Sequence, residues 1–173
     1  MKLNDIGLKH KTDKSTLYHG YLDWYEKHLP KNPKRILEIG VMHGASLRMW
    51  REYYPNAEII GIDIKQPLSI DGVTCLKLDG TTDAVKKLGK FDIIIDDGSH
   101  MTADQQKSFE LLLPQVKKNG VFVMEDIHTS FMPNYINSDK TTYEYLQERD
   151  DVIYFQGKSE KNDSFTSIVK IKG

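Results

Sequence analysis

The sequence predicts an α/β protein with a mostly parallel sheet and helices on both faces. From Arg35 onward, short runs rich in Ile and Val alternate with longer helical patterns, which is typical of strand–helix–strand units. The run from Ile93 to Ile95 is continuously apolar, as expected for a strand that helices cover on both sides. Asn119-Gly120 supplies a turn between a helical pattern and the next strand. These three observations define the fold class.

Each strand is placed where a short apolar run ends in a polar or glycine-containing turn. The seven predicted strands are Arg35–Val41, Glu58–Ile64, Val73–Leu78, Phe91–Asp96, Val121–Glu125, Val152–Gln156 and Phe165–Ile171. Apolar residues at helical spacing predict the intervening helices, which are Ala45–Tyr54, Thr82–Leu88, Thr102–Val116 and Thr141–Arg149. The polar loop Lys158–Asp163 is short enough to join the last two strands in an antiparallel hairpin.

The first 34 residues are predicted to pack on this sheet as a helical segment. Leu17, Tyr21 and Leu29 lie on one stripe at helical spacing, so we expect a helix over Ser15–Leu29 that Pro30 ends. No internal repeat, low-complexity tract or linker divides the chain. One domain over residues 1–173 is therefore expected.

The composition excludes several classes of protein and of binding partner. The chain has 173 residues, 39% hydrophobic and 28% charged, which is enough for one core and too apolar for disorder. Lys plus Arg total 24 and Asp plus Glu total 25, so no broad cationic surface for nucleic acid is expected. Neither an export signal nor a membrane span is indicated. The single Cys75 excludes an internal disulfide and fits a reducing cytoplasm.

The turn after the first predicted strand suits a nucleoside ligand. Two glycines, Gly40 and Gly44, allow close backbone approach, and a helix begins directly after them at Ala45-Ser46. Met42 stands where the G-x-G-x-x-G fingerprint has its second glycine, which disfavours a dinucleotide because pyrophosphate needs an unobstructed backbone there. A tight turn without a ligand is the alternative interpretation of the glycines.

Carboxylates end the second and third predicted strands. Asp63 lies about twenty residues beyond the glycines, where it can accept hydrogen bonds from both ribose hydroxyls. Asp79 is a candidate to bind an adenine amino group, although capping the following helix is its alternative role. With the glycine turn, these carboxylates predict an adenosine site without pyrophosphate.

Four carboxylates gather at the ends of the fourth and fifth predicted strands, in Asp96-Asp97 and Glu125-Asp126. If these strands are neighbours, about 4.8 Å apart, their acids crowd together and repel. A hard divalent cation is the simplest compensation, with Mg²⁺ favoured. Because side chains alternate along a strand, we expect Asp97, Glu125 and Asp126 as ligands and Asp96 toward the ligand side or a backbone contact. Solvated loop acids and helix caps are the alternative.

His100 follows Asp97 by three residues, after a glycine turn, and would stand beside such a cation. An unperturbed imidazole, with a pKa of about 6.5, accepts a proton at neutral pH, so His100 is a candidate general base for a hydroxyl that the cation has acidified. Two other roles stay open: His100 caps the helix that starts near Thr102, or is itself a ligand.

Taken together, these motifs resemble a known family. The segments LEIGVMHGASLRMW, GIDI, IDDGSH and EDIHTS, preceded by KTDKSTLYHGY, resemble the macrocin and mycinamicin type of metal-dependent sugar O-methyltransferases. The resemblance runs from about Thr12 to Ser130. It implies a Rossmann-like class I methyltransferase fold, with S-adenosylmethionine and Mg²⁺ as cofactors and a sugar or glycosylated metabolite as acceptor. Relatives assemble, so a homo-oligomer is a possible assembly.

The resemblance also implies roles for single residues. Asp97, Glu125 and Asp126 correspond to the Mg²⁺ ligands, and His100 corresponds to the base. The cofactor contacts would be Glu38, Gly40, Asp63 and Asp79, with Gly44, Ser46 and Asp96 as further candidates. The stretches Thr12-Asp13-Lys14 and His19–Tyr21 resemble the family's segment near the cofactor, where Tyr18 or Tyr21 is a candidate lid.

Three rival functions are less consistent with these residues. A nicotinamide dehydrogenase is disfavoured by Met42. A metal-dependent hydrolase of phosphate esters would use the carboxylates of the acidic cluster and His100. It would have no role for Glu38, Gly40 and Asp63. A catalytically silent S-adenosylmethionine-binding protein would have no need of a base.

Overall fold

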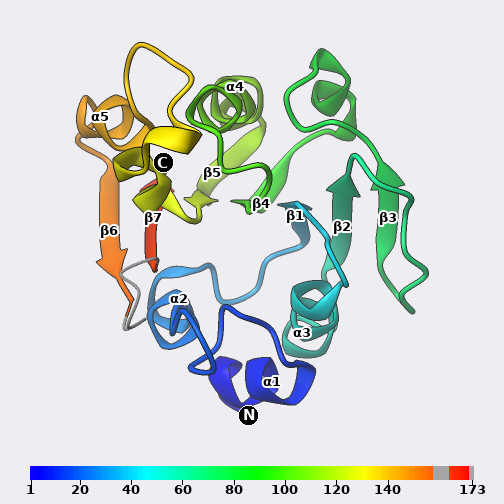
Figure 1. The fold of residues 1–173 in the computed structure, drawn as a ribbon. Coiled ribbons are helices and arrows are strands. Elements are labelled where there is room, and N and C mark those ends of the chain that lie inside the picture. Colours follow the sequence, from blue (N-terminus) through cyan, green and yellow to red (C-terminus); the bar gives the residue numbers. More distant parts are fainter. Residues whose placement is uncertain (158–163, 172–173) are drawn as a thin grey trace.

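The structure, a computed structural model, describes residues 1–157 and 164–171. In this part of the chain, seven strands form one sheet in the order β3-β2-β1-β4-β5-β7-β6 (Figure 1). Their bounds are β1 Arg35–Ile39, β2 Glu58–Asp63, β3 Thr74–Lys77, β4 Phe91–Asp96, β5 Val116–Met124, β6 Val152–Gln156 and β7 Phe165–Lys170. The predicted seven-stranded α/β fold is confirmed.

The strand pairing shows which edge of the sheet is expected to bind a ligand. The neighbours β3, β2, β1, β4 and β5 are parallel, whereas β7 pairs antiparallel with both β5 and β6. The predicted C-terminal antiparallel pair is therefore confirmed, although the loop 158–163 lies outside the described residues. The chain order reverses between β1 and β4, and open α/β sheets bind ligands at such a switch point, beyond the carboxyl ends of the strands.

Helices cover both faces of the sheet. Figure 1 shows α1, α2 and α3 on one side and α4 on the other, and α5 packs against α4. The bounds are α1 Leu3–His10, α2 Leu22–His28, α3 Ala45–Tyr53, α4 Thr102–Leu112 and α5 Thr142–Gln147, with 3-10 turns η1 Asp83–Leu88, η2 Leu113–Gln115, η3 Ile127–Phe131 and η4 Pro133–Tyr135. Among the described residues, no helix is long and apolar enough to cross a membrane.

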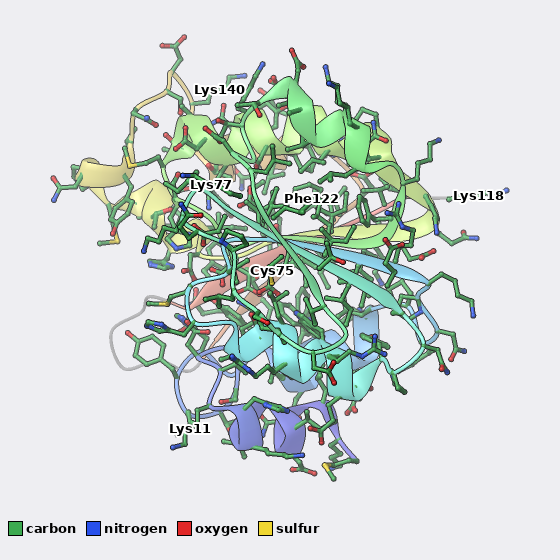
Figure 2. The ribbon with its side chains drawn as sticks, turned by 90° about the vertical axis from the view of Figure 1, so that its right-hand side faces the viewer. Lys11, Cys75, Lys77, Lys118, Phe122 and Lys140 are labelled. Carbon is green, nitrogen blue, oxygen red and sulfur yellow. The ribbon has the colours of Figure 1, made fainter. Side chains whose placement is uncertain are left out.

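Two apolar cores follow from this layering. Ile93 and Ile95 face the core under α1 to α3, whereas Ile94 faces the opposite core with Phe109 and Phe122. In Figure 2, Phe122 lies in the interior while Lys118 extends outward at the periphery. This alternation along β4 explains why the run from Ile93 to Ile95 is continuously apolar: both faces of the strand are buried there.

The predicted N-terminal helix over Ser15–Leu29 is wrong. Two shorter helices, α1 and α2, replace it, and turns connect them. Lys11 ends α1 in the left-handed conformation at φ 58°, and its N–H bonds to the carbonyls of Gly7 and Leu8. Between the helices, Leu17 is 61% exposed instead of buried on a stripe. Side-chain spacing alone does not reveal a left-handed residue that ends a helix.

Other boundaries shift for local reasons. The predicted helix over Thr102–Val116 ends at Leu112 and a 3-10 turn follows, because Pro114 has no N–H to continue the α-helical hydrogen bonds. The segment predicted as a helix over Thr82–Leu88 is likewise the 3-10 turn η1. Strand β5 begins at Val116, before the predicted turn, and its pairing with β4 is irregular near Phe91.

Candidate active site

A cavity of about 1000 Å³ opens at the carboxyl edge of the parallel strands, at the switch point. The turn after β1, the ends of β2 and β4, and the segment from His10 to Asp13 all contribute to its walls. The predicted site residues that line it are Gly40, Ser46, Asp63, Asp79, Asp96, Asp97, His100 and Asp126. Glu38, Gly44, Tyr21 and Glu125 are not among the lining residues.

Gly40 lets two turns approach each other at the cavity. Its φ is +86°, and a Cβ added there would lie 1.9 Å from the carbonyl oxygen of Asp97. Directly beside this contact, the backbone N–H of Asp97 donates to the carbonyl of Ile39 at 2.9 Å. A side chain at Gly40 would therefore push the end of β4, and with it Asp97, away from β1.

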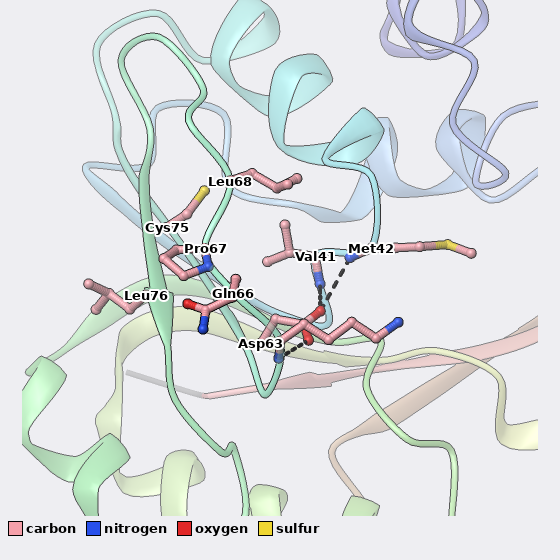
Figure 3. Close-up of a pocket in the computed structure, with 9 residues that line it drawn as sticks. Val41, Met42, Asp63, Gln66, Pro67, Leu68, Cys75 and Leu76 are labelled. Carbon is pink, nitrogen blue, oxygen red and sulfur yellow. Dashed lines mark hydrogen bonds between the residues drawn. The ribbon is translucent and has the colours of Figure 1, made fainter.

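Asp63 braces the same glycine turn. Its Oδ2 accepts hydrogen bonds from the backbone N–H groups of Val41 at 2.9 Å and Met42 at 3.3 Å, and its Oδ1 accepts from Lys65 N–H at 2.9 Å (Figure 3). Burial by itself raises the pKa of Asp63, but these N–H groups outweigh burial and lower the pKa below its ordinary value. An ionised carboxylate thus lines the cavity and shapes its wall.

Glu38 faces the helix that follows it. This fully buried carboxylate accepts a short hydrogen bond from Ser46 Oγ, and its Oε2 accepts from Trp50 Nε1 at 2.6 Å. Burial is the main cause that raises the pKa of Glu38. Glu38 therefore anchors α3 to β1, a role that sequence reasoning missed. The signal was present in Trp50, whose indole N–H needs an acceptor when buried.

Two further aspartates line the cavity. Asp79 closes its own turn, because its Oδ1 accepts from the backbone N–H of Thr81 at 2.8 Å and from Thr81 Oγ1 at 2.7 Å. Asp96 accepts from Ser108 Oγ and from Gly98 N–H at 3.1 Å. Burial raises the pKa of Asp96 to about 6. Both residues keep their backbone turns in place at the cavity edge.

Strands β4 and β5 are neighbours, so their terminal acids converge as expected. His100 Nε2 lies 3.5 Å from Asp126 Oδ2 and 4.0 Å from Asp97 Oδ1. One ligand atom of each residue lies within 4.8 Å of the others, an arrangement that can hold a metal ion. Burial, followed by the charge of Asp97, raises the pKa of Asp126 to about 7.

Glu125 lies deeper, behind this cluster. Its Oε1 accepts from Tyr25 Oη at 2.8 Å, and its Oε2 accepts from Lys14 Nζ at 2.8 Å. Lys14 also pairs closely with Asp97 Oδ2. Burial by itself lowers the pKa of Lys14, but Asp97 and Glu125 outweigh burial and hold the pKa well above its ordinary value. The sequence gives no signal of this contact, because Lys14 and Glu125 lie 111 residues apart in the chain.

Tyr21 is fully buried. Its hydroxyl donates to Asp126 Oδ1 at 3.3 Å, and its ring stacks on His19 with 4.9 Å between the ring centroids. His19 Nδ1 in turn lies 2.7 Å from Ser164 Oγ. The N-terminal segment therefore reaches the acidic cluster through Tyr21, Tyr25 and Lys14.

The doubly wound sheet, the cavity at its switch point and the acid–histidine cluster define an α/β protein with a candidate ligand site beyond the carboxyl ends of its parallel strands. Residues 37–127 match a family model described as "Methyltransferase domain". The chain belongs to this methyltransferase family.

Curated relatives include sugar O-methyltransferases. The chain is 35% identical over 150 residues to the 8-demethyl-8-(2-methoxy-alpha-L-rhamnosyl)-tetracenomycin-C 3'-O-methyltransferase of Streptomyces olivaceus, a match that covers 77% of this chain and 38% of the relative. It is 33% identical, with the same coverage, to the Mycinamicin VI 2''-O-methyltransferase of Micromonospora griseorubida. The chain thus spans less than half the length of these relatives.

Solved structures support the same fold. The MycE methyltransferase from the mycinamycin biosynthetic pathway, in complex with Mg, SAH and Mycinamycin VI, aligns with a TM-score of 0.84 at 25% identity. The match covers 99% of this chain and 55% of that chain. An O-methyltransferase from Bacillus cereus in complex with SAH aligns with a TM-score of 0.58 at 16% identity, which adds support for the fold alone. The predicted Rossmann-like class I methyltransferase fold is confirmed.

Proposed function

We propose that this protein transfers a methyl group from S-adenosylmethionine to a hydroxyl of a sugar or glycosylated metabolite, in a reaction that requires Mg²⁺. The observation that carries the proposal is the convergence of Asp97, His100 and Asp126 on the wall of one large cavity. Relatives named as sugar O-methyltransferases, and the MycE structure with Mg and SAH, support it.

The cavity suits the cofactor. S-adenosylmethionine has no pyrophosphate, so Met42, 71% exposed beside the glycine turn, does not exclude it. We propose that Gly40, Ser46, Asp63, Asp79 and Asp96 contact the cofactor directly, because all of them line the cavity. In this proposal, Glu38 and Gly44 act through the start of α3, and Tyr21 acts through Asp126.

The donor set fits Mg²⁺. Carboxylate oxygens are the ligands that this hard cation prefers, and the acids come from two adjacent strand ends. Asp97 and Asp126, which the structure brings together with His100, would hold the ion, with Glu125 as a third carboxylate behind them that now pairs with Lys14. When bound, Mg²⁺ would make a substrate hydroxyl more acidic.

His100 is placed to take up the proton. Its Nε2 is directed at the two aspartates, at 3.5 and 4.0 Å, which is where an acceptor hydroxyl would be held. S-adenosylmethionine supplies a methyl group that is already activated on a sulfonium. The chain therefore has to align two reactants and remove one proton, and alignment contributes most of the rate enhancement.

The remaining parts of the proposal concern partners and location. The partner is a small-molecule sugar or glycoside, and no nucleic acid or membrane is involved. The near-zero net charge argues against a nucleic-acid partner, and the free thiol of Cys75 fits a reducing cytoplasm. A homo-oligomer is compatible with the proposal.

A methyl-transfer assay tests this function. The protein is incubated with methyl-labelled S-adenosylmethionine and a panel of rhamnosides and macrolide glycosides, with EDTA, and then with Mg²⁺ in excess. We expect transfer of label that EDTA stops and Mg²⁺ restores. Turnover that is insensitive to EDTA would remove the metal from the proposal, whereas product formed without cofactor would favour a hydrolase. Tight S-adenosylmethionine binding without turnover on any glycoside would favour a silent binding protein.

A further inference from the structure

Lys14 is a buried cation inside the acidic cluster, and the reaction proposed above has no use for it. Its side chain is 1% exposed. The ammonium contacts Asp97 Oδ2 and lies 2.8 Å from Glu125 Oε2, so it bridges the ends of β4 and β5. Lysine is almost never buried without a partner, because burying an ammonium costs free energy that only close anions offset. Its position in this interior therefore depends on the two carboxylates.

The backbone around Lys14 is held by its own turns. Tyr21 N–H donates to the carbonyl of Lys14 at 2.8 Å, and His19 N–H donates to the carbonyl of Asp13 at 2.8 Å. The buried Ser15 Oγ donates to Thr12 O at 2.7 Å. These contacts define the position from which the ammonium reaches the acids.

The positive charge of Lys14 offsets part of the negative charge of the acidic cluster. Asp97, Glu125 and Asp126 carry three formal negative charges when ionised, and Lys14 reduces the net charge to two, which one divalent cation neutralises. The contact also selects oxygens. Lys14 occupies Asp97 Oδ2, and Asp97 Oδ1 is the oxygen on the His100 side.

We propose that Lys14 is a positioning residue and internal counter-ion, which holds Asp97 and Glu125 together while no metal is bound and weakens the binding of Mg²⁺. The inference rests on the proposed function. If the ammonium stays in place, it repels the dication; if it is displaced, the dication must compete with it for the same carboxylates. Either way, Lys14 lowers the affinity for the metal and keeps its site assembled.

The test is Mg²⁺ binding by Lys14→Met, which keeps a linear side chain, one atom shorter, and removes its charge. Isothermal titration with MgCl₂, without cofactor or acceptor, should give a dissociation constant at least about tenfold lower than that of the wild type. Lys9→Met is the matched control, because Lys9 pairs with Glu52 on the exposed side of the same N-terminal segment. It should leave Mg²⁺ binding unchanged.

Thermal unfolding with and without Mg²⁺ separates the two roles, because simple loss of packing would lower Tm equally in both buffers. In EDTA, Lys14→Met should have a lower Tm than the wild type, and saturating Mg²⁺ should narrow the difference. An equal difference in both buffers, or an unchanged or weaker Mg²⁺ affinity, would overturn the inference. If the wild type itself fails to bind Mg²⁺, the metal of the proposed function fails first.

If Lys14→Met does not fold, a measurement on the wild type still tests the inference. The Nζ resonance of Lys14, identified in ¹⁵N NMR spectra by its loss in Lys14→Arg, should shift on addition of MgCl₂. Resonances of exposed lysines such as Lys118 should not follow it. An Nζ resonance of Lys14 that is unaffected by saturating Mg²⁺ would also overturn the inference.

Discussion

His100 Nε2 lies 3.5 Å from Asp126 Oδ2, although the two residues follow different strands. Both have left-handed backbones, with φ values of 61° and 54°. Non-glycine residues rarely adopt this conformation, and strained positions of this kind cluster at functional sites. The structure thus keeps an imidazole next to a carboxylate at the wall of the cavity.

Replacement of His100 tests the base. His100→Ala and the size-matched His100→Gln should both lower kcat about 10²- to 10⁴-fold, because neither side chain can take up the proton at that position. Single-turnover methyl transfer measures the chemical step. S-adenosylmethionine affinity, measured by calorimetry, should stay near the wild-type value. Wild-type turnover in either variant would exclude His100 as the base.

Asp97→Asn tests the metal requirement. The amide keeps the shape of the side chain but loses its charge, so Mg²⁺-dependent turnover should be abolished while S-adenosylmethionine binding stays largely intact. Asp83→Asn removes an exposed carboxylate that pairs with Lys86, and serves as the control. Retained turnover in Asp97→Asn at ordinary Mg²⁺ concentrations would contradict the ligand role.

Gly40→Ala tests the close approach of β1 and β4. Its Cβ would overlap the carbonyl of Asp97, so we expect a loss of at least about 2 kcal/mol of unfolding free energy and weaker S-adenosylmethionine binding. Gly20→Ala is the matched control. Gly20 has φ +70° but no atom within 4 Å of an added Cβ, so it should lose only about 1 kcal/mol. Equal losses in urea unfolding would show that backbone strain alone matters.

Asp92, which lies away from the candidate site, is expected to make the stability of the protein depend on pH. Its Oδ2 accepts from the N–H groups of Lys34 and Arg35, each at 2.8 Å, and from Lys117 Nζ at 3.0 Å. Burial by itself raises the pKa of Asp92, but these donors outweigh burial and lower the pKa below its ordinary value. The contribution to stability is therefore present above the unfolded pKa of about 4 and is lost as the pH falls through the folded pKa.

Asp92→Asn should accordingly lower the unfolding free energy at pH 7 by about 1–3 kcal/mol. The difference from the wild type should shrink as the pH falls below about 4. Urea unfolding in EDTA at several pH values measures both quantities, and the exposed Asp139→Asn controls for the loss of one negative charge. A difference that does not change with pH would rule out the ionised carboxylate as its source.

Much of the fold could be predicted from local patterns. Strand β4 was predicted with its observed bounds, because its centre, Ile93–Ile95, is buried on both faces and is continuously apolar. The two N-terminal helices could not be predicted in this way. The apolar spacing there suits a single helix, whereas the turn contacts of Lys11 and Tyr21 favour two helices. Local periodicity does not report such contacts.

The candidate site, too, could be predicted only in part from the sequence. Local patterns in the sequence predict that carboxylates and a histidine follow the ends of two strands, and the carboxyl ends of parallel strands lie along one edge of a sheet. That these two strands are neighbours, and which atoms meet there, depends on the tertiary fold. Glu38 turns to Trp50, and Glu125 turns to Lys14 across 111 residues of chain. Such contacts depend on how distant segments pack, and spacing along the chain carries no record of that packing.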